Sequence, residues 1–430
     1  MRTLSILLIF FSFPVVLSGE QEGKKISLYS KGAILINGKT GAILFEKNAD
    51  KTFYPASITK IATAYYVLKK KALLLDSPIK ASQNAIGAVS SQDKKDSQYA
   101  LSPHWIEFGS SHIGIKRGEI LSLRTLLYGL LLASGNDAAN VLAEYVSGSI
   151  PQFMKELNRE LQEMGCTGTH FLNPHGLHHP DHVTTPQDMA KITQRAFENP
   201  IFREIVRKTR YKRERTNKQA ESFFTSGNRL LLPHSSLFYS HALGIKTGYT
   251  SEAQRTFVAA AEKEGRLLIC VLFSSERIEE KYLDARKLFD HFFAETLHDR
   301  EVVSDRESFY FSLPHAPGVS IEARPERSFI LSYYPSESPP SVYVRISWKG
   351  DLALPISCNQ EVGTLILSYS EGTFLVEKKI PLRAIRDVIP LLKKIEEAFK
   401  LKSVQFFAIL FSFFLLFSLY QVRRLFQLRK

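Results

Sequence analysis

The sequence predicts an α+β protein in which an antiparallel sheet packs with helices, followed by a small β-rich domain and a C-terminal transmembrane helix. Apolar residues recur at helical spacing over residues 58–68 and 121–145, whereas residues 243–273 form short β-type runs separated by polar turns. Between residues 302 and 386 the sequence changes to short alternating runs punctuated by glycine and proline. Residues 403–422 carry no formal charge. At 430 residues, more than one domain is expected.

The N-terminus has the pattern of a signal peptide. An apolar run over residues 4–17 follows Met1 and Arg2, and the small residues Ser18 and Gly19 come next. We therefore expect residues 1–19 to direct export, so that the mature chain works outside the cytoplasm.

Ser57 opens the first predicted helix. The residues after it that recur at helical spacing are Ile58, Ile61, Ala62, Tyr65, Tyr66 and Leu68. Lys60 would project beside Ser57, because residues three apart share a helix face. A lysine can serve as the base for a nucleophilic serine if burial and a second cation lower its pKa, and Lys246 is the candidate for that cation. In the alternative interpretation, Ser57 is an N-cap and Lys60 is a solvated helix residue.

A second Ser-x-x-Lys string runs from Ser91 to Lys94. It lies within a polar stretch, residues 90–97, that lacks apolar periodicity. This context predicts a solvated loop without a catalytic role.

The string Ser134-Gly135-Asn136 interrupts two apolar helical runs. A hydroxyl and an amide at a helix junction inside a dry core need polar partners. Ser134 and Asn136 would find them in Lys60, Lys246 and the substrate, unless Ser134 only caps the next helix. The similar string Ser226-Gly-Asn228 is interpreted as a turn, because it lies between a basic stretch and a short apolar run.

The string Lys246-Thr247-Gly248 ends an apolar, strand-like run. A strand edge at this point supplies backbone N–H groups, an ammonium and a hydroxyl to developing negative charge, and Gly248 lets a substrate backbone come close. The earlier Lys39-Thr40-Gly41 joins two strand-like runs and predicts only a hairpin turn.

A histidine cluster raises the alternative of a metallopeptidase. Its members are His175, His178, His179, Asp181 and His182. Imidazoles at such spacing can bind zinc, but H-E-x-x-H is absent, and a glycine and two prolines predict an irregular loop. We therefore predict no metal site and no cofactor.

The C-terminal third predicts a β-rich spacer and a membrane anchor. Short alternating runs over residues 302–384, punctuated by glycine and proline, predict a small β-sandwich that offers no catalytic cluster. Residues 385–402 have the pattern of an amphipathic helix, and residues 403–422 are long enough to span a bilayer. Together with the signal peptide, this places the basic tail, residues 423–430, in the cytoplasm and the rest of the chain outside.

The chain is basic, with a formal net charge of +13, but the excess is dispersed. An exported chain meets anionic lipids and cell-wall polymers, so we expect no nucleic-acid partner. The local concentration over residues 207–215 is interpreted as a basic surface loop.

The three strings, in this order and at these intervals, resemble those of the low-molecular-weight penicillin-binding proteins, the serine-type D-alanyl-D-alanine carboxypeptidases. The segments 37–48, 173–177 and 228–231 also resemble those of this family. The resemblance implies a catalytic domain over residues 24–298 with the β-lactamase and penicillin-binding fold. It also implies a peptidoglycan stem peptide as substrate, release of its terminal D-alanine, and covalent inhibition by β-lactams.

Carried over by position, the resemblance implies a role for each site residue. Ser57 would be the acylated nucleophile and Lys60 its general base, while Ser134 and Asn136 would relay protons and hold the substrate amide. Lys246, Thr247 and Gly248 would bind the substrate, with its terminal carboxylate on the first two. The backbone N–H groups of Ser57 and Tyr249 would form the oxyanion hole.

Two alternatives stay open at this point: a DD-endopeptidase of the same fold, and a non-catalytic protein that binds the cell wall. Asn37, Pro186 and Gln254 depart from the usual family pattern, and the latter two could reshape loops near the site. A β-lactamase is a weaker fit, because no Glu-x-x-Leu-Asn string is present to supply a deacylating base.

Overall fold

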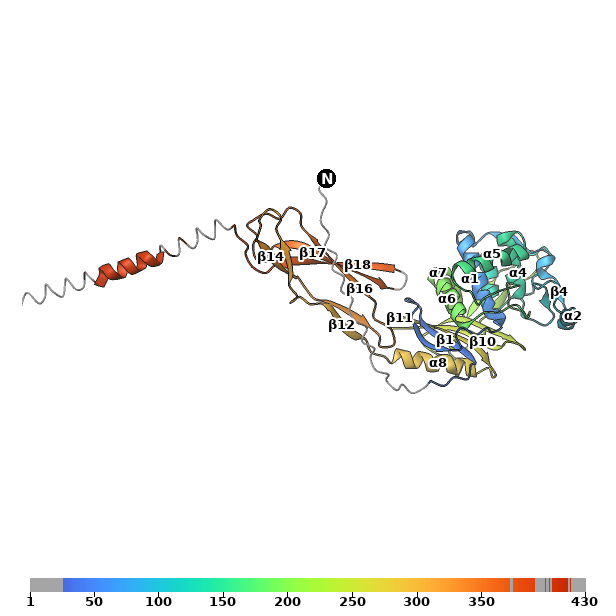
Figure 1. The fold of residues 1–430 in the computed structure, drawn as a ribbon. Coiled ribbons are helices and arrows are strands. Elements are labelled where there is room, and N and C mark those ends of the chain that lie inside the picture. Colours follow the sequence, from blue (N-terminus) through green and yellow to red (C-terminus); the bar gives the residue numbers. More distant parts are fainter. Residues whose placement is uncertain are drawn as a thin grey trace, which may run out of the picture.

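The computed structural model describes residues 26–371, 374–390, 399, 402, 404–416 and 418. The predicted signal peptide, residues 1–19, and the predicted tail, residues 423–430, lie outside these residues. Figure 1 shows a mixed α/β part joined to an elongated β-rich part, with a helix beyond it.

Within the described part of the chain up to Phe293, eight α-helices and four short 3₁₀-helices are defined; a further helix at residues 404–416 is treated below. The α-helices are α1 (Thr59–Lys71), α2 (Ser91–Asp96), α3 (Leu123–Leu131), α4 (Asn136–Ser147), α5 (Ile150–Glu163), α6 (Pro186–Glu198), α7 (Pro200–Arg207) and α8 (Glu280–Phe293). The 3₁₀-helices are η1 (Ala56–Ile58), η2 (Ala72–Leu74), η3 (Asn84–Ile86) and η4 (Arg229–Leu231).

The strands form one central sheet, one sheet in the β-rich part and several two-stranded ribbons. Those before α8 are β1 (Gly32–Asn37), β2 (Ile43–Lys47), β3 (Pro78–Lys80), β4 (Ala88–Val89), β5 (Ile106–Glu107), β6 (Ile120–Ser122), β7 (Arg210–Arg213), β8 (Ser222–Thr225), β9 (Ala242–Thr250), β10 (Gln254–Lys263) and β11 (Arg266–Ser275). Those after it are β12 (His298–Val303), β13 (Phe309–Ser312), β14 (Ser320–Pro325), β15 (Phe329–Tyr333), β16 (Val342–Trp348), β17 (Glu361–Glu371) and β18 (Phe374–Ala384).

The central sheet has the antiparallel order β2-β1-β11-β10-β9, and the central strands β1 and β11 are apolar because both faces of the sheet are covered there. Successive strand residues point to opposite faces. Ile269, Val271 and Phe273 join a core with α1 and α3 to α7, whereas Leu268 and Cys270 join a second core with α8. Figure 1 shows this layering, with α8 alone beneath the sheet. The predicted α+β fold with adjacent antiparallel strands is confirmed.

The segment from Ser91 to Lys94 is helical, so its prediction as a solvated loop is wrong. Ser90 caps α2 by accepting a hydrogen bond from the Asp93 N–H at 2.9 Å. Lys94 is buried and forms an ion pair with Glu107 at 3.2 Å. A six-residue helix is too short to show apolar periodicity, and its cap and ion pair stabilise it instead.

The predicted hairpin turn at Lys39 to Gly41 is confirmed. It connects β1 and β2, the Gly41 N–H donates to the Asn37 carbonyl at 2.8 Å, and Gly41 has a φ of 76°. The Asn37 side chain also accepts hydrogen bonds from the Lys39 and Thr40 N–H groups. This lysine therefore lies in a turn stabilised by its own backbone.

The β-rich part contains a five-stranded sheet, β13-β14-β18-β17-β16, and the two-stranded sheet β12-β15. Side chains from both sheets pack around one apolar core. The loop after β15 contacts the central sheet, because Glu337 forms an ion pair with the buried Arg266 at 3.0 Å and accepts hydrogen bonds from Asn37. The boundaries 24–298 and 302–384 stay predictions.

The amphipathic helix predicted for residues 385–402 does not begin where expected. Residues 385–390 are not helical, because Val388 pairs with Ile356 and packs into the core of the β-rich part. Most of the remaining residues of this segment lie outside those that the structure describes.

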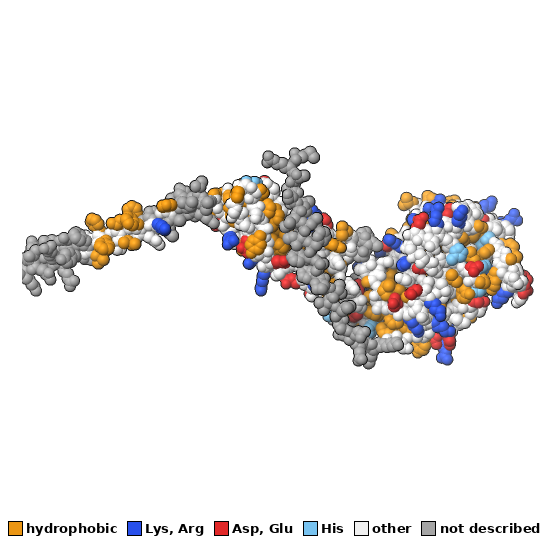
Figure 2. Space-filling model, viewed as in Figure 1, with side chains coloured by type: hydrophobic (Ala, Val, Ile, Leu, Met, Phe, Trp, Pro, Cys, Tyr) orange, Lys and Arg blue, Asp and Glu red, His pale blue; other side chains and the backbone are white. Residues whose placement is uncertain are grey.

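Residues 404–416 form a helix that lies within the predicted span 403–422, whose other residues are mostly outside the described set. Figure 2 shows apolar side chains along this helix. Among the described residues, no helix is both long enough and apolar enough to cross a bilayer.

Candidate active site

Ser57 lies on the 3₁₀ turn that leads into α1, and Lys60 follows on the same face. The Lys60 Nζ lies 3.0 Å from the Ser57 Oγ, so the contact expected from the three-residue spacing is present. The loop that contains Gly176 packs tightly against this turn, because a Cβ on Gly176 would come within 1.9 Å of the Ala56 carbonyl oxygen. Ala56 itself has a φ of 50°. Only glycine at position 176 lets the opposing loop pack against this turn.

Lys60 is fully buried and has only neutral hydrogen-bond acceptors. Besides Ser57, its Nζ donates to the Asn136 Oδ1 at 2.6 Å and to the His175 carbonyl at 2.7 Å. Burial lowers the pKa of Lys60 well below its usual value, and the charge of Lys246 lowers it further, while Asp137 acts in the opposite direction. An amine with a lowered pKa beside a hydroxyl can accept that hydroxyl's proton.

The junction between α3 and α4 brings Asn136 to this pair. Asn136 begins α4, and its Nδ2 donates to the Ser110 Oγ at 3.0 Å. Ser134, with a φ of 60°, lies at the junction, but its hydroxyl makes no hydrogen bond among the described residues. The structure thus joins Asn136 directly to Lys60 by a hydrogen bond, whereas no hydrogen bond joins Ser134 to this pair.

The strand edge of β9 lies beside Ser57, as the sequence predicts. A Cβ on Gly248 would lie 2.9 Å from the Ser57 backbone nitrogen and 2.3 Å from the Thr256 Oγ1. Thr256 in turn donates to the Pro55 carbonyl at 2.8 Å, which fixes the sheet to the turn that carries Ser57. Thr247 precedes Gly248 on this strand and is partly exposed.

Lys246 is buried on the same strand, and its Nζ donates to the Thr247 carbonyl at 2.9 Å. Burial and the nearby charge of Lys281 lower the pKa of Lys246 to about 7. Tyr249 is exposed, with the Arg255 guanidinium over its ring.

Two contributors to the site were missed by sequence reasoning. Lys281 on α8 is buried, and burial followed by the charges of Arg255 and Arg229 lowers its pKa to about 7. Its spacing from the buried Ala285 could have revealed it, because residues four apart share the apolar face of α8. No sequence motif identifies Ser110 as a residue of the site.

The histidine-rich loop supplies backbone and packing contacts. The carbonyl of His175 accepts from Lys60, and its ring Nε2 donates to the His104 carbonyl at 3.1 Å. His182 is buried, with its Nε2 3.0 Å from the Thr59 hydroxyl. Within the described ranges, no group of three or more histidine, cysteine or acidic side chains is arranged to hold a metal ion.

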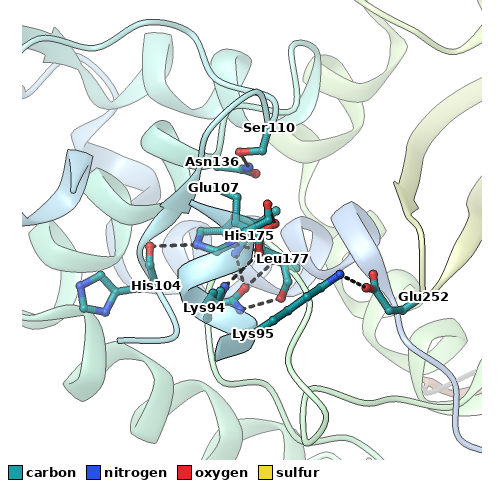
Figure 3. A network of polar contacts seen from close by, with 12 residues as sticks. Lys94, Lys95, His104, Glu107, Ser110, Asn136, His175, Leu177 and Glu252 are labelled. Atoms are coloured by element: carbon teal, nitrogen blue, oxygen red, sulfur yellow. Dashed lines mark hydrogen bonds and ion pairs between the residues drawn. The ribbon is translucent and has the colours of Figure 1, made fainter. Parts of the chain in front are cut away.

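A pocket of about 240 Å³ opens next to Ser110 and Tyr249. One wall is α2 with the segment 107–110, and the opposite wall is the turn between β9 and β10. Figure 3 shows Lys95 of α2 extending across to Glu252 of that turn.

The sheet, the helical layer and the serine–lysine pair define the class: a serine-type peptidase with the fold of the penicillin-binding DD-peptidases. The family model described as D-alanyl-D-alanine carboxypeptidase, peptidase S11, matches residues 19–276. The chain therefore belongs to the D-alanyl-D-alanine carboxypeptidase family, which confirms the resemblance seen in the sequence.

Similar proteins support this membership. The D-alanyl-D-alanine carboxypeptidase DacF of Bacillus subtilis is 29% identical over 389 residues, which cover 88% of this chain and 92% of that protein. The D-alanyl-D-alanine carboxypeptidase of Streptomyces sp. strain K15 is 31% identical over 280 residues, or 63% of this chain and 89% of that one.

Solved structures are similar in fold. The Streptomyces K15 DD-transpeptidase matches with a TM-score of 0.54 and 28% identity, over 63% of this chain and all of that one. DacD from Francisella tularensis, at 22% identity and a TM-score of 0.56, covers 88% of this chain and 99% of its own and shows likeness of fold alone.

Proposed function

We propose that this protein removes the terminal D-alanine from peptides that end in D-alanyl-D-alanine, as peptidoglycan stem peptides do, through an ester on Ser57. The observation that carries the proposal is the Lys60 Nζ, which lies 3.0 Å from the Ser57 Oγ. That amine has a pKa lowered well below its usual value. A neutral amine at this position is the base that a serine nucleophile requires.

In the acylation step, Lys60 takes the Ser57 proton as the Oγ attacks the carbonyl carbon of the penultimate D-alanine. The N–H groups of Ser57 and Tyr249 stabilise the resulting oxyanion, and removing one such donor typically costs about 2.7–4 kcal/mol of barrier. Lys246 and Thr247 bind the terminal carboxylate, and Gly248 allows the substrate backbone to approach, as its contact with the Ser57 nitrogen supports.

In the second half of the reaction, the proton held by Lys60 passes to the leaving nitrogen through Ser134, and D-alanine departs with an amine. Asn136 holds the amide of the substrate, since it is fixed between Lys60 and Ser110. Water then hydrolyses the ester and restores Ser57. A β-lactam would acylate the same hydroxyl, and its opened ring would stay attached until that ester is hydrolysed.

The enzyme would act outside the cytoplasm, held by its C-terminal segment. Two observations support this placement: the apolar N-terminal run and the exposed apolar side chains of residues 404–416. We expect the full-length chain to sediment with membranes, and a chain ending at residue 390 to remain in solution.

The activity is tested by D-alanine release from a pentapeptide that ends in D-Ala-D-Ala, with the full-length protein in detergent. Wild type and the matched control Ser91→Ala are expected to release D-alanine, whereas Ser57→Ala is not. A folded wild type that releases none and forms no penicillin adduct would instead support the wall-binding alternative. Cleavage of cross-linked peptides alone would indicate an endopeptidase.

A further inference from the structure

The pocket beside the candidate active site is continuous with it on two sides. Tyr249, which lines the pocket, directly follows Gly248, whose position lies against the Ser57 nitrogen. Ser110, on the other wall, accepts the hydrogen bond from Asn136. A D-Ala-D-Ala peptide bound at Ser57, before its terminal D-alanine leaves, would therefore place the residue that precedes the two D-alanines near this pocket.

Two ion pairs in the pocket differ in how firmly they are held. Lys94 and Glu107 are 3.2 Å apart, Lys94 is buried, and Ser91 also donates to Glu107 at 2.9 Å. This pair joins α2 to the adjacent segment 106–107 and forms the fixed side of the pocket (Figure 3).

The second pair crosses the pocket from wall to wall. Lys95 and Glu252 are 3.7 Å apart, their side chains are 52% and 26% exposed, and the contact is too long for a hydrogen bond. An exposed pair of this kind contributes about 1 kcal/mol or less, so separating it costs little. Each charge is then free to take a new partner of opposite sign.

The chemistry of an incoming side chain follows from the two charges. A side chain with an ammonium alone would pair with Glu252 but would leave Lys95 facing a like charge. A carboxylate alone would pair with Lys95 and would face Glu252. A side chain that ends in both groups can pair with Lys95 and with Glu252, so that two ion pairs replace one.

We propose that Lys95 and Glu252 form a specificity subsite for a substrate side chain that carries both an ammonium and a carboxylate, on the residue before D-Ala-D-Ala. This inference rests on the proposed function. An extended chain advances at most about 3.6 Å per residue, so Glu252, four residues beyond Gly248, lies at most about 14 Å along the strand direction. The turn between β9 and β10 shortens this distance, and a substrate side chain of several carbons reaches the pocket.

The test compares kcat/KM for D-alanine release from four N-acylated peptides X-D-Ala-D-Ala. The residue X is diaminopimelic acid with both charges, lysine with an ammonium, 2-aminoadipic acid with a carboxylate, or Nε-acetyllysine with neither. For wild type we expect the doubly charged peptide to exceed each singly charged one by at least about threefold, from the size of exposed ion pairs.

The variants separate the two charges. Lys95→Gln should lower kcat/KM for the doubly charged peptide to that of the lysine peptide, and Glu252→Gln should lower it to that of the aminoadipate peptide. The double variant Lys95→Glu/Glu252→Lys should restore the preference. Matched controls are Lys349→Gln and Glu361→Gln, from a surface pair in the β-rich part at 3.2 Å, which should leave all four values unchanged.

Acylation by benzylpenicillin separates failure of the inference from failure of the proposed function, because this drug carries neither charge on its side chain at the pocket. Normal penicillin acylation and D-alanine release, with equal kcat/KM for all four peptides, would overturn the subsite alone. Absence of both acylation and release in folded wild type would overturn the proposed function.

Discussion

The regions around Ser57 and Ser91 carry the same Ser-x-x-Lys spacing at the start of a helix, and both lysines are buried, yet their partners differ. Lys60 donates to three neutral acceptors, one of which is the Ser57 hydroxyl. Lys94 pairs with the carboxylate of Glu107, and the Ser91 hydroxyl donates to that same carboxylate. The hydrogen-bond partner of the buried amine, rather than the Ser-x-x-Lys spacing, therefore decides whether the serine has a base beside it.

The largest contrast is expected when each serine is removed. Ser57→Ala should lower the rate of benzylpenicillin acylation by at least about 10³-fold, because the nucleophile is lost. Ser91→Ala should still form the adduct to completion, because its hydroxyl serves an ion pair. Intact-mass spectrometry over time measures both, and an adduct that forms on Ser57→Ala at the wild-type rate would break the comparison.

Replacing each lysine by methionine should change activity and stability in different ways. Lys60→Met should slow acylation by about 10²–10⁴-fold, the usual contribution of a general base, without lowering stability, because a buried amine is replaced by an apolar group. Lys94→Met should lower the free energy of unfolding by up to about 3 kcal/mol, because the Glu107 carboxylate loses its cationic partner and keeps only the hydrogen bond from Ser91.

Denaturant unfolding and penicillin acylation, measured on the same preparations, test this pair of variants. Both changes remove one buried amine and keep a similar side-chain length, so each is the control for the other. Equal losses of stability, or equal losses of acylation, would contradict the different roles given to the two amines.

A change at Lys246 should shift the pH profile of acylation. The charge of Lys246 is the second cause, after burial, of the lowered pKa of Lys60. Removing that charge in Lys246→Gln raises the pKa of Lys60, and acylation requires the neutral amine. The acid limb of the profile, measured with benzylpenicillin from pH 5 to 9, should therefore move to higher pH. An unmoved limb, or one at lower pH, would show that Lys246 does not act on Lys60.

The smallest expected effect concerns Lys281, a third buried lysine with no carboxylate partner among the described residues. Its pKa is about 7 in the folded protein, below its usual value, so the folded state binds fewer protons than the unfolded state between about pH 7 and 10.5. Burial of the charged Lys281 amine therefore destabilises the folded protein fully below about pH 7 and not at all above about pH 10.5. Lys281→Met should thus raise stability by roughly 1 kcal/mol or more at pH 7 and by almost nothing above pH 10.5.

Thermal unfolding of Lys281→Met and wild type across this pH range measures the difference. Lys287→Met, on an exposed part of the same helix, is the matched control and should show no such pH-dependent gain. A gain that persists unchanged above pH 10.5 would indicate that improved packing, rather than removal of the charge, is the cause.

Side-chain patterns predicted much of this molecule. The central strands, the turn at Lys39 and the closeness of Lys60 to Ser57 follow from local rules of alternation, turn chemistry and helix spacing. The approach of the strand edge at Gly248 to Ser57 was predicted from the chemistry of the three strings together, although the two residues are nearly two hundred positions apart.

Other features depend on contacts that no local pattern carries. The His175 carbonyl that binds Lys60 is a backbone group, and its position depends on the close packing of Gly176 against Ala56. The helix at Ser91 is too short to show apolar periodicity. Val388 is not helical as predicted, because it forms a β-bridge with Ile356.

Titration of the Lys60 amine itself tests whether this residue can serve as the base for Ser57. Protein labelled with ¹³C at the lysine ε carbon is followed by NMR as a function of pH, and the Lys60 signal is assigned as the one missing from Lys60→Met. We expect this signal to titrate well below pH 10.5, because the amine is buried, has neutral hydrogen-bond partners and lies near the charge of Lys246. A Lys60 amine that stays charged up to pH 10 would contradict it.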